Sequence, residues 1–211
     1  MTTRAKRETK RVGSARPSQL IYTFGAGSIV DLPNFSVIVA GIDDWEQFDR
    51  HQMVISEPRL LEAVQANLSR SVKEMRTAPW MEETRSPFDE WAFVGVPVIP
   101  FPRWLRCTDL RCNRIAPIDS GMFKLESDHP FRPDLTQYYH QHSNKKTPSI
   151  PVRFVVACPN GHIDDFPWIE YAHRKAPGGV CDAPMLKLYD TGAGPRSTDM
   201  MVECLSCEAS A

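Results

Sequence analysis

The sequence predicts an α+β fold in which short strands and a few helices surround zinc-ribbon-like knuckles. The chain has 18 prolines in 211 residues. Proline interrupts helices and strand ladders, so this number favours short elements and fixed turns over a helical bundle. Six cysteines stand in short pairs or near histidines, a pattern typical of tetrahedral Zn2+ sites. With 42% hydrophobic residues, the chain can also build an ordinary core.

We expect three segments: a basic disordered tail over residues 1–16, an N-terminal α/β segment over 17–100, and a zinc-binding segment over 101–211 that is incomplete at its C-terminus. The formal net charge of −1 gives no global reason to expect nucleic-acid binding. Six Lys and Arg residues stand against one Glu in the tail. A solvated tail is the simplest interpretation, and contact with phosphates is the alternative.

The N-terminal segment is predicted to begin with extended chain over 17–33 around a Gly25–Ser28 turn. A strand follows over 34–42, where apolar residues alternate. The residues 57–70 predict a helix with Pro58 in its first turn and an apolar side formed by Leu60, Leu61, Val64 and Leu68.

In the zinc-binding part, we expect strands at 91–101, 150–157, 185–189 and 199–203. The polar residues 126–149 predict a loop in which His129, His140 and His142 are solvated. A helix is expected to open at residues 164–167 and to run through Arg174. Asp164 and Asp165 stand at its start, where carboxylates can cap backbone N–H groups.

The cysteines and histidines suggest two zinc sites. The short spacings C-x4-C and C-P-N-G-H predict a first site, formed by Cys107, Cys112, Cys158 and His162. The remaining candidates predict a second site, formed by His173, Cys181, Cys204 and Cys207. A single four-cysteine site built from Cys107, Cys112, Cys204 and Cys207 is the alternative. Either arrangement has four protein ligands, which indicates structural rather than catalytic zinc.

An enzymatic function is the less favoured interpretation. His162 with Asp164 could serve a metal-dependent hydrolase or nuclease, but helix capping explains the carboxylate more simply. The sequence shows no Walker motif, nucleophile elbow or zinc-protease helix motif. It also shows no apolar leader at its N-terminus and no stretch long enough to span a membrane. We therefore expect a cytoplasmic protein, in which reduced thiols favour metal over disulfides.

Several stretches resemble one family. The opening RPSQLIYTFGAGSIVDLP, the GIDDW at 41–45, the run FVVACPNGHIDDFPW at 154–168 and the later cysteines are similar to the N-terminal part of DrmB, a zinc-containing subunit of the DISARM anti-phage defence system. The resemblance implies a non-catalytic protein that pairs with the helicase-like ATPase DrmA and helps the complex to engage DNA. DrmB-like chains are much longer than this one, so we expect a fragment, a truncated gene product or the ordered part of a larger protein.

A cluster of arginines near the first cysteine pair is our candidate for contact with DNA. Arginine binds phosphate through charge and paired hydrogen bonds. The candidates are Arg103, Arg106, Arg111 and Arg114. Contact with a partner protein, or packing of the aliphatic stems of Arg103 and Arg106 against Trp104, is the alternative.

Overall fold

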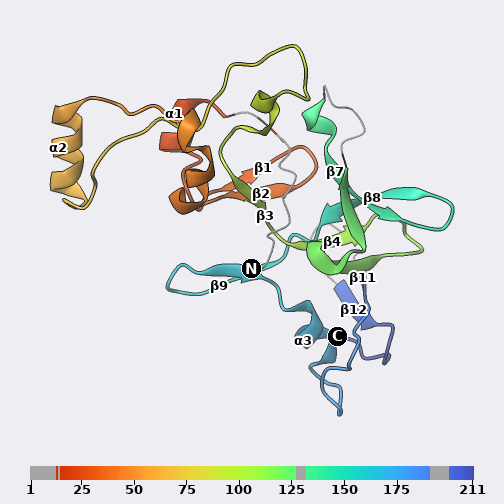
Figure 1. The fold of residues 1–211 in the computed structure, drawn as a ribbon. Coiled ribbons are helices and arrows are strands. Elements are labelled where there is room, and N and C mark those ends of the chain that lie inside the picture. Colours follow the sequence, from red (N-terminus) through yellow and green to blue (C-terminus); the bar gives the residue numbers. More distant parts are fainter. Residues whose placement is uncertain (1–12, 14, 127–131, 191–199) are drawn as a thin grey trace, which may run out of the picture. The chain divides into compact units, whose positions relative to one another are not determined.

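The computed structural model describes residue 13 and residues 15–126, 132–190 and 200–211. Helices and antiparallel strands occur together in it, so the predicted α+β class is confirmed (Figure 1). The chain divides into two compact units: Met1–Val30 with Ile38–Ile99, and Asp31–Val37 with Pro100–Ala211. Most of the predicted basic tail lies outside the described residues. None of the helices in the described ranges has the length and apolar character needed to cross a bilayer.

The first unit combines short helices with a three-stranded sheet of order β1-β2-β3, and the division between units passes through these strands. The elements in chain order are α1 (Pro17–Tyr22), β1 (Ile29–Asp31), β2 (Ser36–Val39), the 3-10 helix η1 (Ile42–His51), α2 (Pro58–Asn67), the 3-10 helix η2 (Glu90–Phe93) and β3 (Val98–Pro100).

Two predictions for this unit need correction. The segment 17–33, expected to be extended, begins with α1. Pro17 presets the helical φ at the first position, and the Gln19 side chain accepts a hydrogen bond from the Arg16 N–H at 2.8 Å. The expected strand 91–101 is shortened to β3, and η2 occupies its beginning. The predicted helix at 57–70 is present as α2, but none of its residues is buried.

The second unit contains a seven-stranded antiparallel sheet of order β12-β11-β5-β4-β8-β7-β6, and a two-stranded hairpin, β9-β10. Its strands are β4 (Trp104–Cys107), β5 (Arg114–Pro117), β6 (Phe123–Glu126), β7 (Gln137–Gln141), β8 (Lys146–Pro151), β9 (Val155–Ala157), β10 (Ile163–Asp165), β11 (Leu186–Asp190) and β12 (Met200–Cys204). Its helices are the 3-10 turns η3 (Ile118–Ser120) and η4 (Pro133–Leu135) and the α-helix α3 (Trp168–His173).

The polar segment 126–149, predicted to be a loop, contains the strands β7 and β8 instead. Tyrosine favours strands, and β7 contains two tyrosines. Tyr138 is also buried, at 6% exposed, and packs edge-to-face against Phe35. Polar residues that face outward weaken the apolar pattern of this strand, so the sequence alone predicts a loop. His129 lies outside the described residues.

The prediction that Asp164 and Asp165 cap a helix is also wrong. Both residues belong to β10, and α3 begins after Pro167 without a side-chain cap. Asp165 instead accepts a hydrogen bond from the Arg103 N–H at 2.8 Å. The strand expected at 150–157 divides between the end of β8 and β9.

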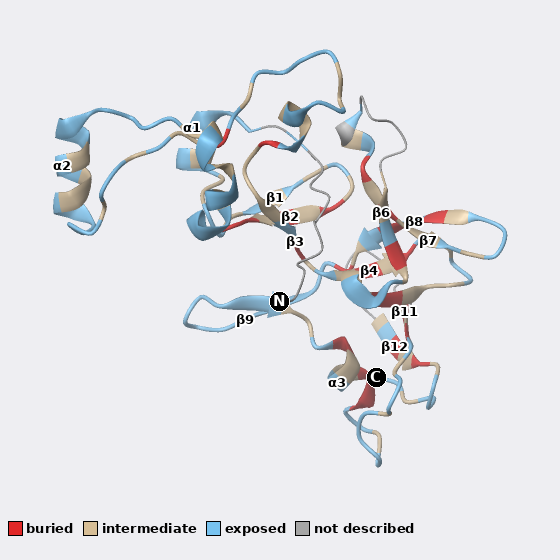
Figure 2. Cartoon of the chain, viewed as in Figure 1, coloured by how far each residue is buried: buried red, intermediate tan, exposed pale blue. Residues whose placement is uncertain are grey.

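The main core of this unit lies between α3 and the β12 side of the sheet. Ile115, Leu186, Leu188 and Val202 pack there with Trp168 from the helix. Figure 2 shows buried residues on these elements and also on β6, β7 and β8, whereas β9 and most of β10 are exposed.

Candidate metal centres

The structure brings four potential ligands together at one end of the strands β4 and β7. This first cluster consists of Cys107, Cys112, His140 and His142, whose ligand atoms all lie within 4.8 Å of one another. Cys107 ends β4 and Cys112 follows in a tight turn, whereas His140 lies in β7 and His142 directly after it. The two histidines are two residues apart in extended chain, so their side chains point to the same face of the sheet.

Hydrogen bonds fix the turn that carries Cys112. The Asp109 carbonyl accepts from the Cys112 N–H at 2.9 Å, and the Asp109 side chain accepts from the Arg111 N–H at 2.9 Å. Lys145, in the β7-β8 turn, donates to the other carboxylate oxygen of Asp109 at 2.5 Å. These contacts hold the pKa of Asp109 down at about 2, chiefly through Lys145. The ion pair therefore joins the cysteine turn to the turn that carries His142.

The spacing of the ligand atoms suits a tetrahedral ion. Cys107 Sγ lies 3.3 Å from His142 Nε2, and Cys112 Sγ lies 3.5 Å from His140 Nδ1. With bond lengths of about 2.0–2.3 Å, the edges of a tetrahedral Zn2+ site measure about 3.3–3.8 Å. These two sulfur–nitrogen distances match those edges, and all four ligand atoms lie within 4.8 Å of one another, so the cluster could hold a metal ion.

Burial sets the charge states in this cluster. Cys107 is fully buried, and burial raises the pKa of its thiol to about 11. Burial also lowers the pKa of His140, with help from the charges of His142 and Arg114, and so favours the neutral imidazole that binds metals. A buried thiol of this kind becomes a thiolate when a cation is bound beside it.

A second cluster lies between α3 and the end of β12. It consists of His173, Cys181, Cys204 and Cys207, and its ligand atoms also lie within 4.8 Å of one another. Cys204 ends β12, Cys207 follows in the next turn, and His173 is the last residue of α3. Cys181 comes from the loop between α3 and β11. The distances are 3.7 Å between the sulfurs of Cys181 and Cys204, and 3.2 Å between Cys207 Sγ and His173 Nε2.

The surroundings of the second cluster orient its ligands. His173 Nδ1 lies 2.7 Å from the Ile169 carbonyl oxygen, so it carries the proton and leaves Nε2 free to bind a metal. Burial alone would raise the pKa of Cys204. Backbone N–H groups of Ser206, Met185 and Cys207 outweigh it and lower that pKa to about 6. All six cysteines are free thiols, and the 3.7 Å sulfur separation is far beyond a disulfide bond.

The register of the sheet places the two clusters on opposite faces. Cys204 lies opposite Leu186, Leu186 opposite Ile115, and Ile115 opposite Arg106. Cross-strand partners share a face, so Arg106 shares the face of Cys204, and the adjacent Cys107 points to the other face. Cys107 and Cys204 therefore belong to different clusters, in contrast to the single four-cysteine alternative.

The grouping expected for the first site differs from the one in the structure. Cys107 and Cys112 lie with His140 and His142, whereas Cys158 and His162 lie at the tip of the β9-β10 hairpin. The physical reason is strand pairing, because β8 lies between β4 and β7 and brings His140 of β7 and the following His142 to the end of β4. The four residues expected at the second site are those that the structure brings together.

The residues of the hydrolase alternative lie in exposed positions. His162 is at the hairpin tip and Asp164 is in β10, where its carboxylate accepts a hydrogen bond from the Asp165 N–H at 2.8 Å. The cavity described below lies elsewhere, beside the second cluster.

The four arginines differ in their surroundings. Arg103 forms an ion pair with Asp119 at 2.6 Å, which offsets its charge. Arg106 and Arg114 are half-buried on neighbouring strands, and Arg111 is exposed in the turn that carries Cys112.

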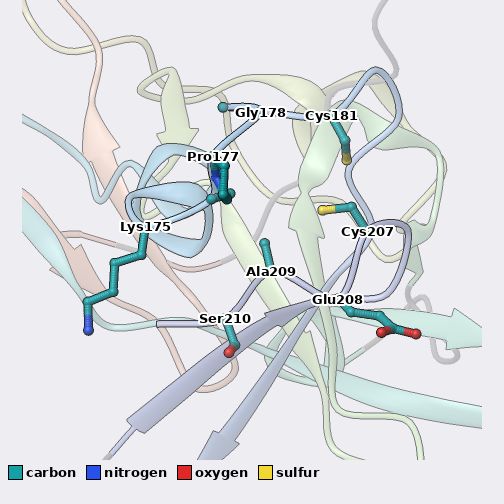
Figure 3. Close-up of a pocket in the computed structure, with 10 residues that line it drawn as sticks. Lys175, Pro177, Gly178, Cys181, Cys207, Glu208, Ala209 and Ser210 are labelled. Atoms are coloured by element: carbon teal, nitrogen blue, oxygen red, sulfur yellow. The ribbon is translucent and has the colours of Figure 1, made fainter.

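A cavity of about 470 Å³ adjoins the second cluster, since Cys181 and Cys207 are among the residues that line it. Figure 3 shows Cys181 and Cys207 in its wall, with Pro177 and Gly178 of the α3-β11 loop beside them. Lys175 and Glu208 supply one charge of each sign, so the lining favours neither anions nor cations.

Comparison with known proteins places the chain in a family. A family described as "Domain of unknown function (DUF8724)" matches residues 16–211, and the chain belongs to it. The chain is also similar to the DISARM protein DrmB of Bacillus paralicheniformis (strain ATCC 9945a / NCIMB 11709 / CD-2), with 33% identity over 113 residues. That alignment covers 52% of this chain but 18% of the relative. The DrmB relationship is therefore shown over about half of this chain, which spans a small part of the relative's length.

Proposed function

We propose that this DUF8724 family member is a non-catalytic, zinc-stabilised module of a DISARM-type anti-phage defence system in the bacterial cytoplasm. In this proposal it associates with a helicase-like ATPase of the DrmA type and helps the assembly to engage DNA. The observation that carries the proposal is the similarity to DrmB, combined with two clusters of four potential ligands on opposite faces of one sheet.

The donor sets support zinc in a structural role. The first cluster offers two thiols and two imidazoles, and the second offers three thiols and one imidazole. Such soft tetrahedral sets favour Zn2+ over Mg2+ or Ca2+. Each cluster supplies all four ligands from the protein, which leaves no position for a reactive water. The ions would hold β4 to β7 and α3 to β12.

Exposed apolar side chains in the first unit support association with another protein. Tyr22 is 86% exposed, Phe88 74% and Trp80 67%. Large aromatic residues are enriched at the centres of protein interfaces. A helicase-like partner that covers them is part of the proposal.

Contact with DNA is proposed through Arg111 and Arg114, which lie beside the first cluster. Arg106 is a weaker candidate because its side chain lies on the opposite face of the sheet. Arg103 is also a weaker candidate because Asp119 already pairs with it. Phosphate contacts of this kind give affinity that falls with salt and depends little on sequence.

Phage plating on cells that carry the whole defence system tests the function. We expect Cys107→Ser or Cys204→Ser in the corresponding subunit to abolish protection, because each removes a buried ligand. Leu110→Ala is the matched control, since this side chain is 84% exposed in the same turn as Cys112. Full protection by both cysteine variants, with normal protein levels, would contradict the proposal. Co-purification with the helicase-like ATPase tests the partner separately.

A further inference from the structure

The tip of the β9-β10 hairpin presents a cysteine and a histidine in the geometry of metal ligands. Cys158 Sγ lies 3.4 Å from His162 Nδ1. The turn between them is fixed by a hydrogen bond from the Cys158 N–H to the His162 carbonyl at 3.0 Å, and by another from the Gly161 N–H to the Cys158 carbonyl at 3.0 Å. Gly161 has a φ of +84°, which other residues rarely adopt. The pair is therefore preformed by the backbone.

This pair is half of a tetrahedral donor set. The 3.4 Å separation equals the sulfur–nitrogen edge of a zinc site, about 3.5 Å. Both residues are exposed. Within the described residues, no metal-binding group of three or more includes either of them. The other five cysteines of this sequence all belong to the two clusters, so none of them is left to complete this set.

A second copy of this chain supplies a matching set. Two hairpin tips that meet across a twofold axis present two cysteines and two histidines. Two thiolates neutralise the charge of one Zn2+, and four ligands close its coordination. Closed dimers with a twofold axis are the commonest symmetric assemblies, and their interfaces use the same residues on both sides.

The hairpin that carries the pair is accessible for such a contact. It extends away from the seven-stranded sheet in Figure 1, and its strands lie at the surface in Figure 2. Val155, Val156 and Ile163 are 39%, 40% and 42% exposed. An isolated two-stranded hairpin is only marginally stable in water. Contact with a second hairpin would cover these apolar side chains.

We propose that Cys158 and His162 form half of a third metal site, which takes one Zn2+ between two copies of the chain. This site is separate from the two clusters and does not depend on the defence function. It makes the chain a zinc-dependent dimer whose contact is the hairpin tip.

A zinc titration of purified protein tests this site. The starting material has both clusters filled and contains a phosphine reductant, which prevents a disulfide between two Cys158 thiols. Zinc is added stepwise, the molar mass is followed by light scattering, and bound zinc is counted after free metal is removed. We expect the mass to double as bound zinc rises from two to two and a half ions per chain.

Three variants decide between the outcomes. Cys158→Ser and His162→Ala should stay single chains while keeping two zinc ions and an unchanged melting temperature, since both residues are exposed. Asn160→Ala is the matched control in the same turn and should dimerise like the parent chain. A third zinc at one per chain without doubling of the mass would overturn the proposal. Doubling that survives in both ligand variants, or the absence of any zinc beyond two per chain, would overturn it as well.

Discussion

Replacing His142 with alanine tests the membership of the first cluster. His142 Nε2 lies 3.3 Å from Cys107 Sγ, so the substitution removes one of four ligands. Its main chain remains free to form the β7-β8 turn, in which the His142 N–H donates to the Lys145 carbonyl at 2.8 Å. The loss should therefore be one of metal binding rather than of the hairpin.

The size of the effect follows from the number of ligands. Structural zinc in small modules contributes about 10–16 kcal/mol of apparent binding free energy, so a quarter share is about 2.5–4 kcal/mol. This corresponds to a loss of affinity of roughly 70- to 900-fold. For a chain of this size, the same free energy lowers the melting temperature by about 5–15 °C.

The assay counts zinc by mass spectrometry of the native protein after dialysis at low protein concentration, and follows melting by calorimetry. We expect His142→Ala to hold one zinc where the parent chain holds two. His162→Ala is the matched control and should hold two, because that residue lies outside both clusters. If His142→Ala kept both ions and His162→Ala lost one, His162 rather than His142 would be the ligand of the first cluster.

Three further predictions concern the clusters and the arginines. Cys204→Ser should destabilise the protein more than Cys112→Ser in calorimetry, because Cys204 is fully buried within the main core whereas Cys112 is half-buried. A brief exposure to EDTA should leave zinc in place, and its complete removal by a stronger chelator should abolish the near-UV circular dichroism of the aromatic core; rapid loss of zinc with an unchanged spectrum would contradict a structural role. The double variant Arg111→Ala, Arg114→Ala should reduce the salt dependence of DNA binding by the assembled complex by about 1.8 in the logarithmic slope. Arg103→Ala should change the slope less, because Asp119 pairs with Arg103, and a gel shift across salt concentrations measures both.

Local spacing indicates which cysteines come together in each cluster. The pairs Cys107-x4-Cys112 and Cys204-x2-Cys207 predict knuckles at strand ends, and the first cysteine of each pair is the last residue of a strand. Pairing of distant residues was harder to predict. The isolated Cys181 reaches Cys204 only because a loop returns to the end of β12, and no short spacing signals this.

The sequence does not indicate the histidines of the first cluster as ligands, because the segment that carries them is polar. The run Gln137–Gln141 is polar and so predicts a loop, yet its tyrosine content favours a strand. In a strand, the spacing His140-x-His142 places both imidazoles on one face, which is a ligand signal. The short spacing of Cys158 and His162 predicts that they belong to the first site. In the structure they lie together at the tip of the β9-β10 hairpin and outside the first cluster.

The central claim is that two four-ligand zinc clusters lie on opposite faces of one sheet. Crystals of the zinc-loaded protein, measured at the zinc absorption edge, test it most directly by anomalous scattering. We predict one peak bonded to Cys107, Cys112, His140 and His142, and another bonded to His173, Cys181, Cys204 and Cys207. A peak that joins Cys107 and Cys112 to Cys158 and His162, with His140 and His142 unbound, would contradict the account.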